Sequence, residues 1–130
     1  MRFVEAKLRV WIVFGTDIKF GDGRARLLEL IGERGSLRQA AAELDMSYRN
    51  AWGYLQELEK AAGFKLIERA PDGGRRSGMR LTTNGREFLA RYRTFQRALD
   101  GAARRHFART FRGKRFGRRR PSGSRPDRRR

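Results

Sequence analysis

Six residues between positions 47 and 56 have chemistry suited to nucleic acid: Ser47, Tyr48, Arg49, Asn50, Gly53 and Gln56. An arginine fork matches the O6 and N7 atoms of guanine, and the amides of asparagine and glutamine match adenine. Hydroxyls and free backbone N–H groups at a helix start suit phosphate. A glycine lets a helix approach base edges closely. On an ordinary exposed helix the same residues are simply solvated, so the surrounding elements must decide between the two interpretations.

These residues fall on the second of two predicted helices that meet at a tight turn. Ser36 can cap a first helix, in which apolar residues recur at helical spacing up to Leu44. Ser47 can cap a second helix over residues 48–62. Its apolar face is formed by Ala51, Leu55, Leu58 and Ala62. The pair predicts a helix-turn-helix rather than a general helical hairpin. Ser36, Arg38 and Gln39 are then expected near the DNA backbone, although plain solvation is an alternative for Arg38 and Gln39.

A predicted hairpin and helix precede this pair. Residues 7–14 alternate between apolar and polar, as a half-buried strand does, and residues 18–20 can form a short return strand. A helix is expected over residues 23–33, with Asp22 as its cap. Its apolar stripe is formed by Ala25, Leu27, Leu28 and Ile31.

A second hairpin is expected after the pair, with strands at residues 64–69 and 79–81. The loop between them, residues 71–78, is rich in glycine and carries Arg75 and Arg76. Glycine-rich loops are usually only turns. A basic hairpin directly after a helix-turn-helix is, however, typical of the wing of a winged helix. We therefore expect Arg75 and Arg76 to contact DNA without fixing a base.

A long helix capped by Thr82 or Thr83 is expected to continue to about Ala108. Apolar residues recur along it at alternating steps of four and three, which is a heptad-like seam. A helix this long cannot bury the whole seam on a small domain, so we expect a homodimer through it. The alternative is a helix that packs only on its own domain. The seam residues assigned to dimerisation are Phe88, Tyr92, Phe95 and Leu99.

The charge is strongly positive and unevenly distributed. The formal net charge is +18 and the isoelectric point is near 11.7, which predicts a polyanionic partner. Residues 112–130 hold ten of the 32 Lys and Arg residues and one of the 14 acidic residues. We expect residues 1–110 to form one domain and residues 111–130 to be a disordered, arginine-rich tail.

Several function classes lack the residues that they need. There is no cysteine and His106 is the only histidine, which argues against an enzyme, a metal site or a cofactor. Glu57 and Glu59 follow helical register and are expected to pair with Lys60 or other bases. The longest apolar run, residues 10–14, is too short for a membrane span. We expect a cytoplasmic protein with no membrane partner.

Several motifs together resemble the DNA-binding domain of ModE-type molybdate-responsive regulators, which are relatives of LysR-type winged helices. The resemblance covers roughly residues 7–100, and residues 46–52 are its most discriminating part. The matching residues are Gly35, Ser36, Ala40, Ala41, Leu44, Met46–Trp52, Leu66–Arg69, Gly73, Gly74 and Leu81–Gly85. The resemblance implies DNA binding and dimerisation. Family members carry C-terminal domains that bind molybdate, whereas an arginine-rich tail follows here, so we expect no molybdate to bind this chain.

The predicted fold class is α+β, mainly α: a winged helix-turn-helix with an N-terminal β-hairpin, a β-wing and a long C-terminal helix. The predicted function is a sequence-specific transcriptional regulator that binds double-stranded DNA as a dimer. The alternative is an RNA-binding or nucleoid-associated protein that binds mainly by charge. Base-reading side chains and the self-complementary seam favour the regulator, while the tail favours the alternative. Trp52 lies at the edge of the apolar face, where packing is the expected role.

Overall fold

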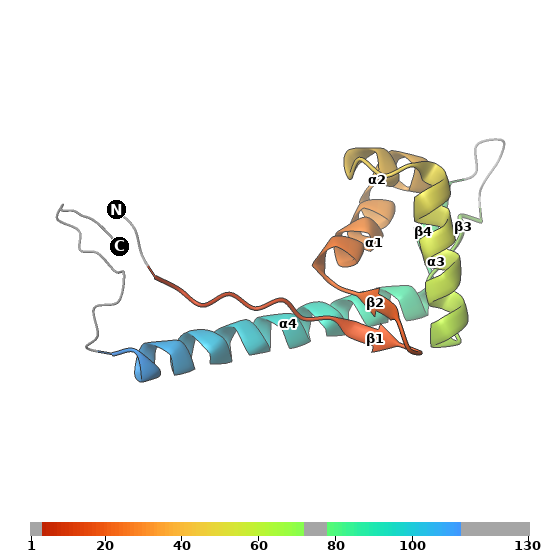
Figure 1. Ribbon diagram of the computed structural model, residues 1–130. Coiled ribbons are helices and arrows are strands. Elements are labelled where there is room, and N and C mark those ends of the chain that lie inside the picture. The colour runs from red at the N-terminus through yellow and green to blue at the C-terminus, as the bar shows by residue number, and fades with distance from the viewer. Residues whose placement is uncertain (1–3, 72–77, 113–130) are drawn as a thin grey trace. The chain divides into compact units, whose positions relative to one another are not determined.

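A computed structural model describes residues 4–71 and 78–112, and within these ranges the chain forms four helices and four short strands (Figure 1). The chain divides into two compact units. One comprises Arg9–Phe95, and the other comprises Met1–Leu8 together with Gln96–Arg130. The winged helix-turn-helix predicted from the sequence is the first of these units. The predictions for Arg75 and Arg76 and for the tail beyond residue 112 lie outside the described residues.

The N-terminal hairpin is shorter than its sequence pattern indicates. β1 (Ile12–Phe14) pairs antiparallel with β2 (Ile18–Phe20), and the register places Ile12 opposite Phe20. The return strand is therefore confirmed, but the strand predicted over residues 7–14 forms only at its end. The reason is that β2 has three residues before the next helix begins. The alternating residues before Ile12 consequently have no partner strand.

α1 (Asp22–Arg34) buries the predicted stripe and also Leu30. The prediction that Asp22 caps this helix is wrong, because the N-cap residue is Gly21 and no side chain bonds there. A Cβ at Gly21 would lie 2.4 Å from the Trp11 side chain, so a larger residue at this cap position would require Trp11 to move. Asp22 lies in the first turn, and its carboxylate accepts a hydrogen bond from Arg93 instead.

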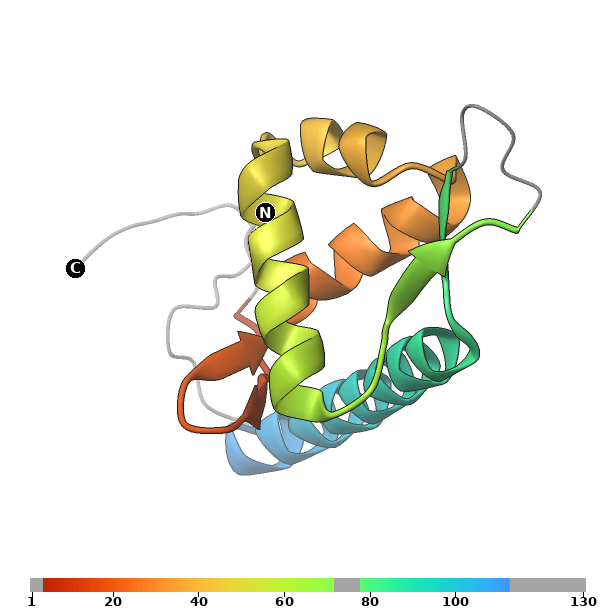
Figure 2. The same ribbon diagram turned by 90° about the vertical axis from the view of Figure 1, so that its right-hand side faces the viewer.

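The helix-turn-helix is confirmed, with α2 at Leu37–Glu43 and α3 at Tyr48–Ala62. Ser36 Oγ accepts the Gln39 N–H and Ser47 Oγ accepts the Asn50 N–H, both at 3.0 Å. Between the helices Asp45 has a φ of 56°, the left-handed region that aspartate tolerates better than most residues. Figure 2 shows α2 lying across the N-terminal end of α3.

The second hairpin pairs β3 (Ile67–Arg69) with β4 (Met79–Leu81) and leads directly into α4 (Thr83–Thr110). Thr82 caps α4, since its Oγ1 accepts the Gly85 N–H at 2.8 Å and donates to Lys65 O at 2.7 Å. β3 begins three residues later than predicted. The chain that leads into β3 is held by a side chain rather than by strand pairing, because the Glu59 carboxylate accepts the N–H groups of Leu66 and Ile67 at 2.7 and 3.1 Å.

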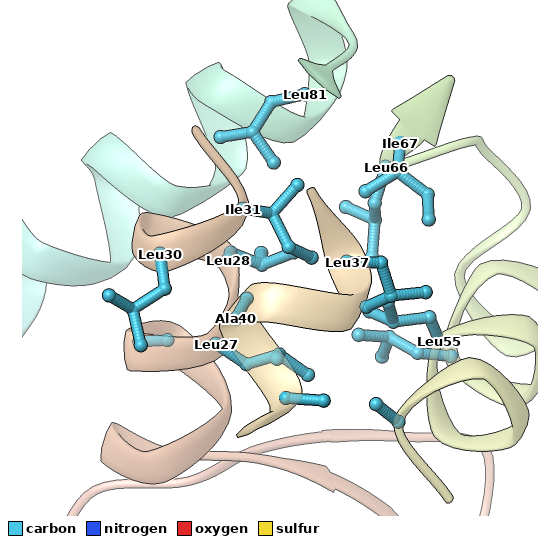
Figure 3. Close-up of a cluster of buried hydrophobic side chains, with 14 of the residues drawn as sticks. Leu27, Leu28, Leu30, Ile31, Leu37, Ala40, Leu55, Leu66, Ile67 and Leu81 are labelled. Atoms are coloured by element: carbon cyan, nitrogen blue, oxygen red, sulfur yellow. The ribbon is translucent and has the colours of Figure 1, made fainter. Parts of the chain in front are cut away.

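The core of the Arg9–Phe95 unit joins side chains from both helices of the helix-turn-helix, from α1 and from the second hairpin. Figure 3 shows ten of them: Leu27, Leu28, Leu30, Ile31, Leu37, Ala40, Leu55, Leu66, Ile67 and Leu81. The shared core fixes α2 and α3 to α1. Each buried leucine or isoleucine contributes about 1.5–3 kcal/mol relative to exposure.

Of the predicted dimer seam, Tyr92 belongs to this core and Phe88 is half-buried against it. The Phe20 ring lies 4.8 Å from the Phe88 ring and 5.1 Å from the Tyr92 ring, between centroids. Tyr92 is only 2% exposed, and its hydroxyl donates to Val10 O at 2.8 Å. Phe88 and Tyr92 thus pack on their own domain, which was the alternative to a dimer contact at these two positions. The heptad-like spacing arises here because the same face of α4 covers the N-terminal hairpin.

A glycine at the start of α4 permits a close backbone approach that can be tested. A Cβ at Gly85 would lie 2.2 Å from Leu66 O, whereas a Cβ at Gly53 in α3 would have no neighbour within 4 Å. Gly85→Ala should therefore lower the free energy of unfolding by about 1–3 kcal/mol. Gly53→Ala is the matched control and should raise it by up to about 1 kcal/mol, the usual gain within a helix. Urea unfolding of both variants measures the free energy of unfolding. If it rose in both variants, the close backbone approach at Gly85 would be contradicted.

Candidate nucleic-acid interface

The exposed side of α3 carries the residues predicted to read bases. Arg49, Asn50 and Gly53 are exposed and Gln56 is half-buried. The opposite side of the helix is formed by Ala51, Leu55 and Leu58, each at most 1% exposed. The core therefore fixes the rotation of α3 about its axis. As a consequence, the guanidinium and amide groups are presented on a side of α3 that the domain itself does not cover.

The N-terminal end of α3 gathers groups suited to phosphate. Ser47 is exposed, and because its oxygen only accepts the Asn50 N–H, its own proton remains available to donate. The Arg38 guanidinium from α2 lies 4.3 Å from the centroid of the Tyr48 ring, a cation–π distance. This contact brings a positive charge of α2 to the start of α3. Gln39 is exposed on α2, while Ser36 is half-buried and serves as the cap.

The positive charges of the helix-turn-helix are not neutralised within the domain. Arg26, Arg34, Arg80, Arg91 and Arg93 all form ion pairs with carboxylates. Within the described ranges, Arg38, Arg49 and Lys60 form none. The carboxylates therefore neutralise arginines of the surrounding frame and leave cations free on α2 and α3, as a surface for a polyanion requires.

A partly buried ion-pair network connects α4 to α1. Arg93 Nε donates to Glu29 Oε2 at 2.8 Å and its Nη1 donates to Asp22 Oδ1 at 2.6 Å. Chiefly through the hydrogen bond from Arg93, the pKa of Glu29 is lowered from its ordinary value of 4.5. The hydrogen bond to Glu29 correspondingly raises the pKa of Arg93. The pair holds the frame on which α2 and α3 rest, rather than contacting a ligand.

Two residues on α3 have roles that were not predicted from the sequence. Glu59 was expected to pair with Lys60 or other basic residues. Lys65 Nζ lies 3.5 Å from one of its oxygens, but Glu59 is also only 7% exposed and binds the amides that lead into β3. Tyr54 donates from its hydroxyl to Lys19 O at 2.9 Å, and desolvation raises its pKa to about 12. These contacts anchor α3 at both hairpins. The Tyr54 contact joins residues far apart in the sequence, so no local pattern could have revealed it.

Trp52 is partly covered, as expected at the edge of the apolar face, but it remains 39% exposed. It lies on the same helix as Arg49 and one turn beyond Tyr48, which is 41% exposed. The signal available in the sequence was its position four residues after Tyr48, which places the two rings on one side of a helix.

The two other residues of the predicted dimer seam are less covered than Tyr92. On α4, Phe95 is 46% exposed and Leu99 is half-buried. In residues 4–71 and 78–112 no group of His, Cys, Asp and Glu is arranged to hold a metal ion. None of the helices in the same ranges is long and apolar enough to span a bilayer.

Comparison with known proteins finds a family match and several similar proteins for this domain. Residues 24–86 match the family described as bacterial regulatory helix-turn-helix protein, lysR family. The chain is 37% identical over 83 residues to the molybdenum transport protein ModE of Azotobacter vinelandii, and 35% identical over 79 residues to the transcriptional regulator ModE of Haemophilus influenzae. Each alignment covers 61% of this chain and 31% of the relative. The chain thus spans about a third of the length of these relatives.

A solved structure is similar over the same region. The crystal structure of the CbnR_DBD-DNA complex has a TM-score of 0.52 and 27% sequence identity to this chain, and covers 68% of this chain and 98% of the solved one. The predicted fold, a winged helix-turn-helix, is confirmed by this likeness, and so is the resemblance to ModE- and LysR-type regulators.

The ion pair between α4 and α1 predicts a specific acid dependence of stability. Because the pKa of Glu29 is lowered in the folded chain, its contribution is fully present above pH 4.5 and is lost as the pH falls through the lowered value. The free energy of unfolding should therefore decrease as the pH falls below 4.5, and Glu29→Gln should reduce that decrease. Chemical unfolding over this range measures both. Glu57→Gln, which alters an exposed glutamate of α3, is the control and should leave the decrease unchanged. If the free energy of unfolding fell as steeply with pH in Glu29→Gln as in the unaltered chain, the assignment would be contradicted.

Proposed function

We propose that this chain, whose residues 24–86 form a LysR-type helix-turn-helix domain, is a sequence-specific regulator of transcription that binds double-stranded DNA. The observation that carries the proposal is the exposed side of α3. It presents Arg49, Asn50 and Gln56 together, on a helix whose opposite side is locked in the core. A recognition helix in the major groove needs this arrangement, with its N-terminal residues at the base edges.

Base reading is assigned to the side chains on this side of α3. Arg49 offers the fork that matches guanine, and Asn50 and Gln56 offer the amides that match adenine. Gly53 has no side chain between the helix and the bases, and a Cβ there would meet nothing in the domain. The glycine is therefore not needed for the fold, which supports a role in close approach to DNA.

Contacts to the phosphate backbone are assigned to groups near the helix starts. Ser47 and Tyr48 stand at the start of α3, where backbone N–H groups lack helical partners. Arg38 and Gln39 approach from α2, with Ser36 as the cap behind them. We assign Arg75 and Arg76 to the backbone as well, on the wing that follows α3. These contacts position the protein and carry no sequence information.

The proposal favours a regulator over a protein that binds nucleic acid by charge alone. Relatives of the domain include a protein described as the DNA-binding transcriptional dual regulator ModE, from Escherichia coli K12, at 33% identity over 69 residues. The similar solved domain is in complex with DNA. No catalytic function is proposed, and no role in binding molybdate is assigned to this chain.

Dimerisation remains part of the proposal, on a smaller surface than the sequence indicated. Phe88 and Tyr92 are occupied by the core, so the α4 residues left for a second copy are Phe95 and Leu99. Phe95 is 46% exposed although its side chain is large and apolar, which supports a role in an interface. A two-fold dimer would place two copies of α3 about one DNA turn apart, roughly 34 Å, or a multiple of it.

Base reading and backbone contact can be separated with two arginine variants. Arg49→Ala should cost about 1–3 kcal/mol on the preferred site and relax discrimination there. Arg38→Ala is the matched control; it should weaken all sequences similarly and lower the salt slope by about 0.9 per lost phosphate contact. Titrations on specific and scrambled duplexes at two salt concentrations measure both effects. If Arg49→Ala weakened binding to both duplexes equally, Arg49 would be reassigned to the phosphate backbone of the DNA.

The dimer surface can be tested at a single exposed residue. Phe95→Glu should shift the chain toward monomer, because two copies would then bury like charges in place of two rings. Light scattering at tens of micromolar concentration compares it with the unaltered chain. Trp11→Glu, at another exposed aromatic residue (54%), should leave the mass unchanged. An unaltered chain that is monomeric both free and on DNA would overturn the dimer.

A further inference from the structure

Two aromatic side chains of α3 remain partly exposed and have no part in the base contacts assigned above. Trp52 and Tyr48 are 39% and 41% exposed. Trp52 makes no hydrogen bond, ring contact or cation–π contact with any residue of the described ranges. Keeping apolar surface in water is unfavourable by about 25 cal/mol per Å², and exposed apolar patches rimmed by polar residues commonly mark binding surfaces.

Trp52 lies on α3 at the boundary between the buried face and the exposed side that carries Arg49. Residues three and four apart are neighbours on a helix surface. Arg49 precedes Trp52 by three positions, Tyr48 precedes it by four, and Gln56 follows it by four. The indole is therefore flanked by the two side chains assigned to bases, Arg49 and Gln56, and by the Tyr48 ring.

The Tyr48 ring is supported from outside α3. The Arg38 guanidinium lies over it at 4.3 Å, which restricts the ring without covering its exposed edge. The two aromatic residues thus form an apolar strip beside Arg49, and we call Tyr48 and Trp52 the aromatic strip. Arg38 and Arg49, the cations next to it, form no ion pair with described residues. Unpaired cations around an apolar strip favour a polyanion with an apolar group over an uncharged protein surface.

DNA offers one such apolar group in the major groove, the C5-methyl of thymine. We propose that Trp52, supported by Tyr48, contacts a thymine methyl group next to the base read by Arg49, which makes Trp52 a specificity-determining residue. The inference rests on the proposed function, because it requires α3 to enter the major groove. It adds an apolar recognition element to a surface otherwise described by hydrogen bonds.

The test removes the methyl group and the indole separately and together. The full chain is first used to select its preferred duplex from a random pool, and each thymine is then replaced by deoxyuridine, which lacks only the methyl group. One replacement should weaken binding about fourfold, which corresponds to the ~0.8 kcal/mol of one buried methyl group. Trp52→Ala should weaken binding on the order of tenfold, and the same deoxyuridine duplex should then bind it as well as the thymine duplex.

Two further variants separate recognition from folding. Trp52→Phe keeps an apolar ring and should retain most of the sensitivity to deoxyuridine. Trp11→Ala makes the same type of change at the other tryptophan, 54% exposed, and should alter neither affinity nor sensitivity. The inference would be overturned if the Trp52→Ala variant still bound the deoxyuridine duplex about fourfold more weakly than the thymine duplex. It would also be overturned if no deoxyuridine replacement weakened binding to the preferred duplex while Arg49→Ala still relaxed the specificity of the chain. If no preferred sequence is selected, the proposed function and this inference both fail.

Discussion

The crossing of α2 over α3 depends on small side chains at the contact, and the surface proposed to bind DNA depends on that crossing. Ala40 and Ala41 of α2 and Ala51 of α3 are at most 1% exposed and belong to one core. A larger residue at any of the three would push the helices apart or force strain into the core. Since α3 is then locked by Leu55 and Leu58, its polar side has one orientation, and Arg49, Trp52 and Gln56 are presented together.

Polar contacts hold the ends of this frame. Glu59 closes the turn from α3 into β3 by accepting two backbone N–H groups. Tyr54 bonds the first hairpin, and Arg93 joins α4 to α1 through two carboxylates. Each of these groups is buried or half-buried and has a partner, as the cost of burying unpaired polar groups demands. Two of the three carboxylates on α2 and α3, those of Glu43 and Glu59, are bound in this frame, whereas Arg38, Arg49 and Lys60 form no ion pair with any described residue.

The parts of the fold that could be predicted from the sequence are those with local signals. The serine caps at positions 36 and 47 and the apolar spacing of α1, α2 and α3 required only neighbouring residues. The exceptions depend on tertiary contacts. Strand ends were misjudged because pairing stops where β2 stops. The heptad-like seam was predicted to contact a second copy of the chain, although Phe20 of the same domain packs against Phe88 and Tyr92. A period identifies the buried face of a helix but not what buries it.

We propose that α3 reads sequence while the abundant positive charge adds affinity. The sharpest test is selection of bound duplexes from a random pool, carried out with the full chain and with residues 1–112 alone. Both chains are expected to enrich the same sequence, and the shorter chain should bind it more weakly and with a smaller salt slope. If the shorter chain enriched no sequence, or if neither chain did, α3 would not be the element that reads sequence.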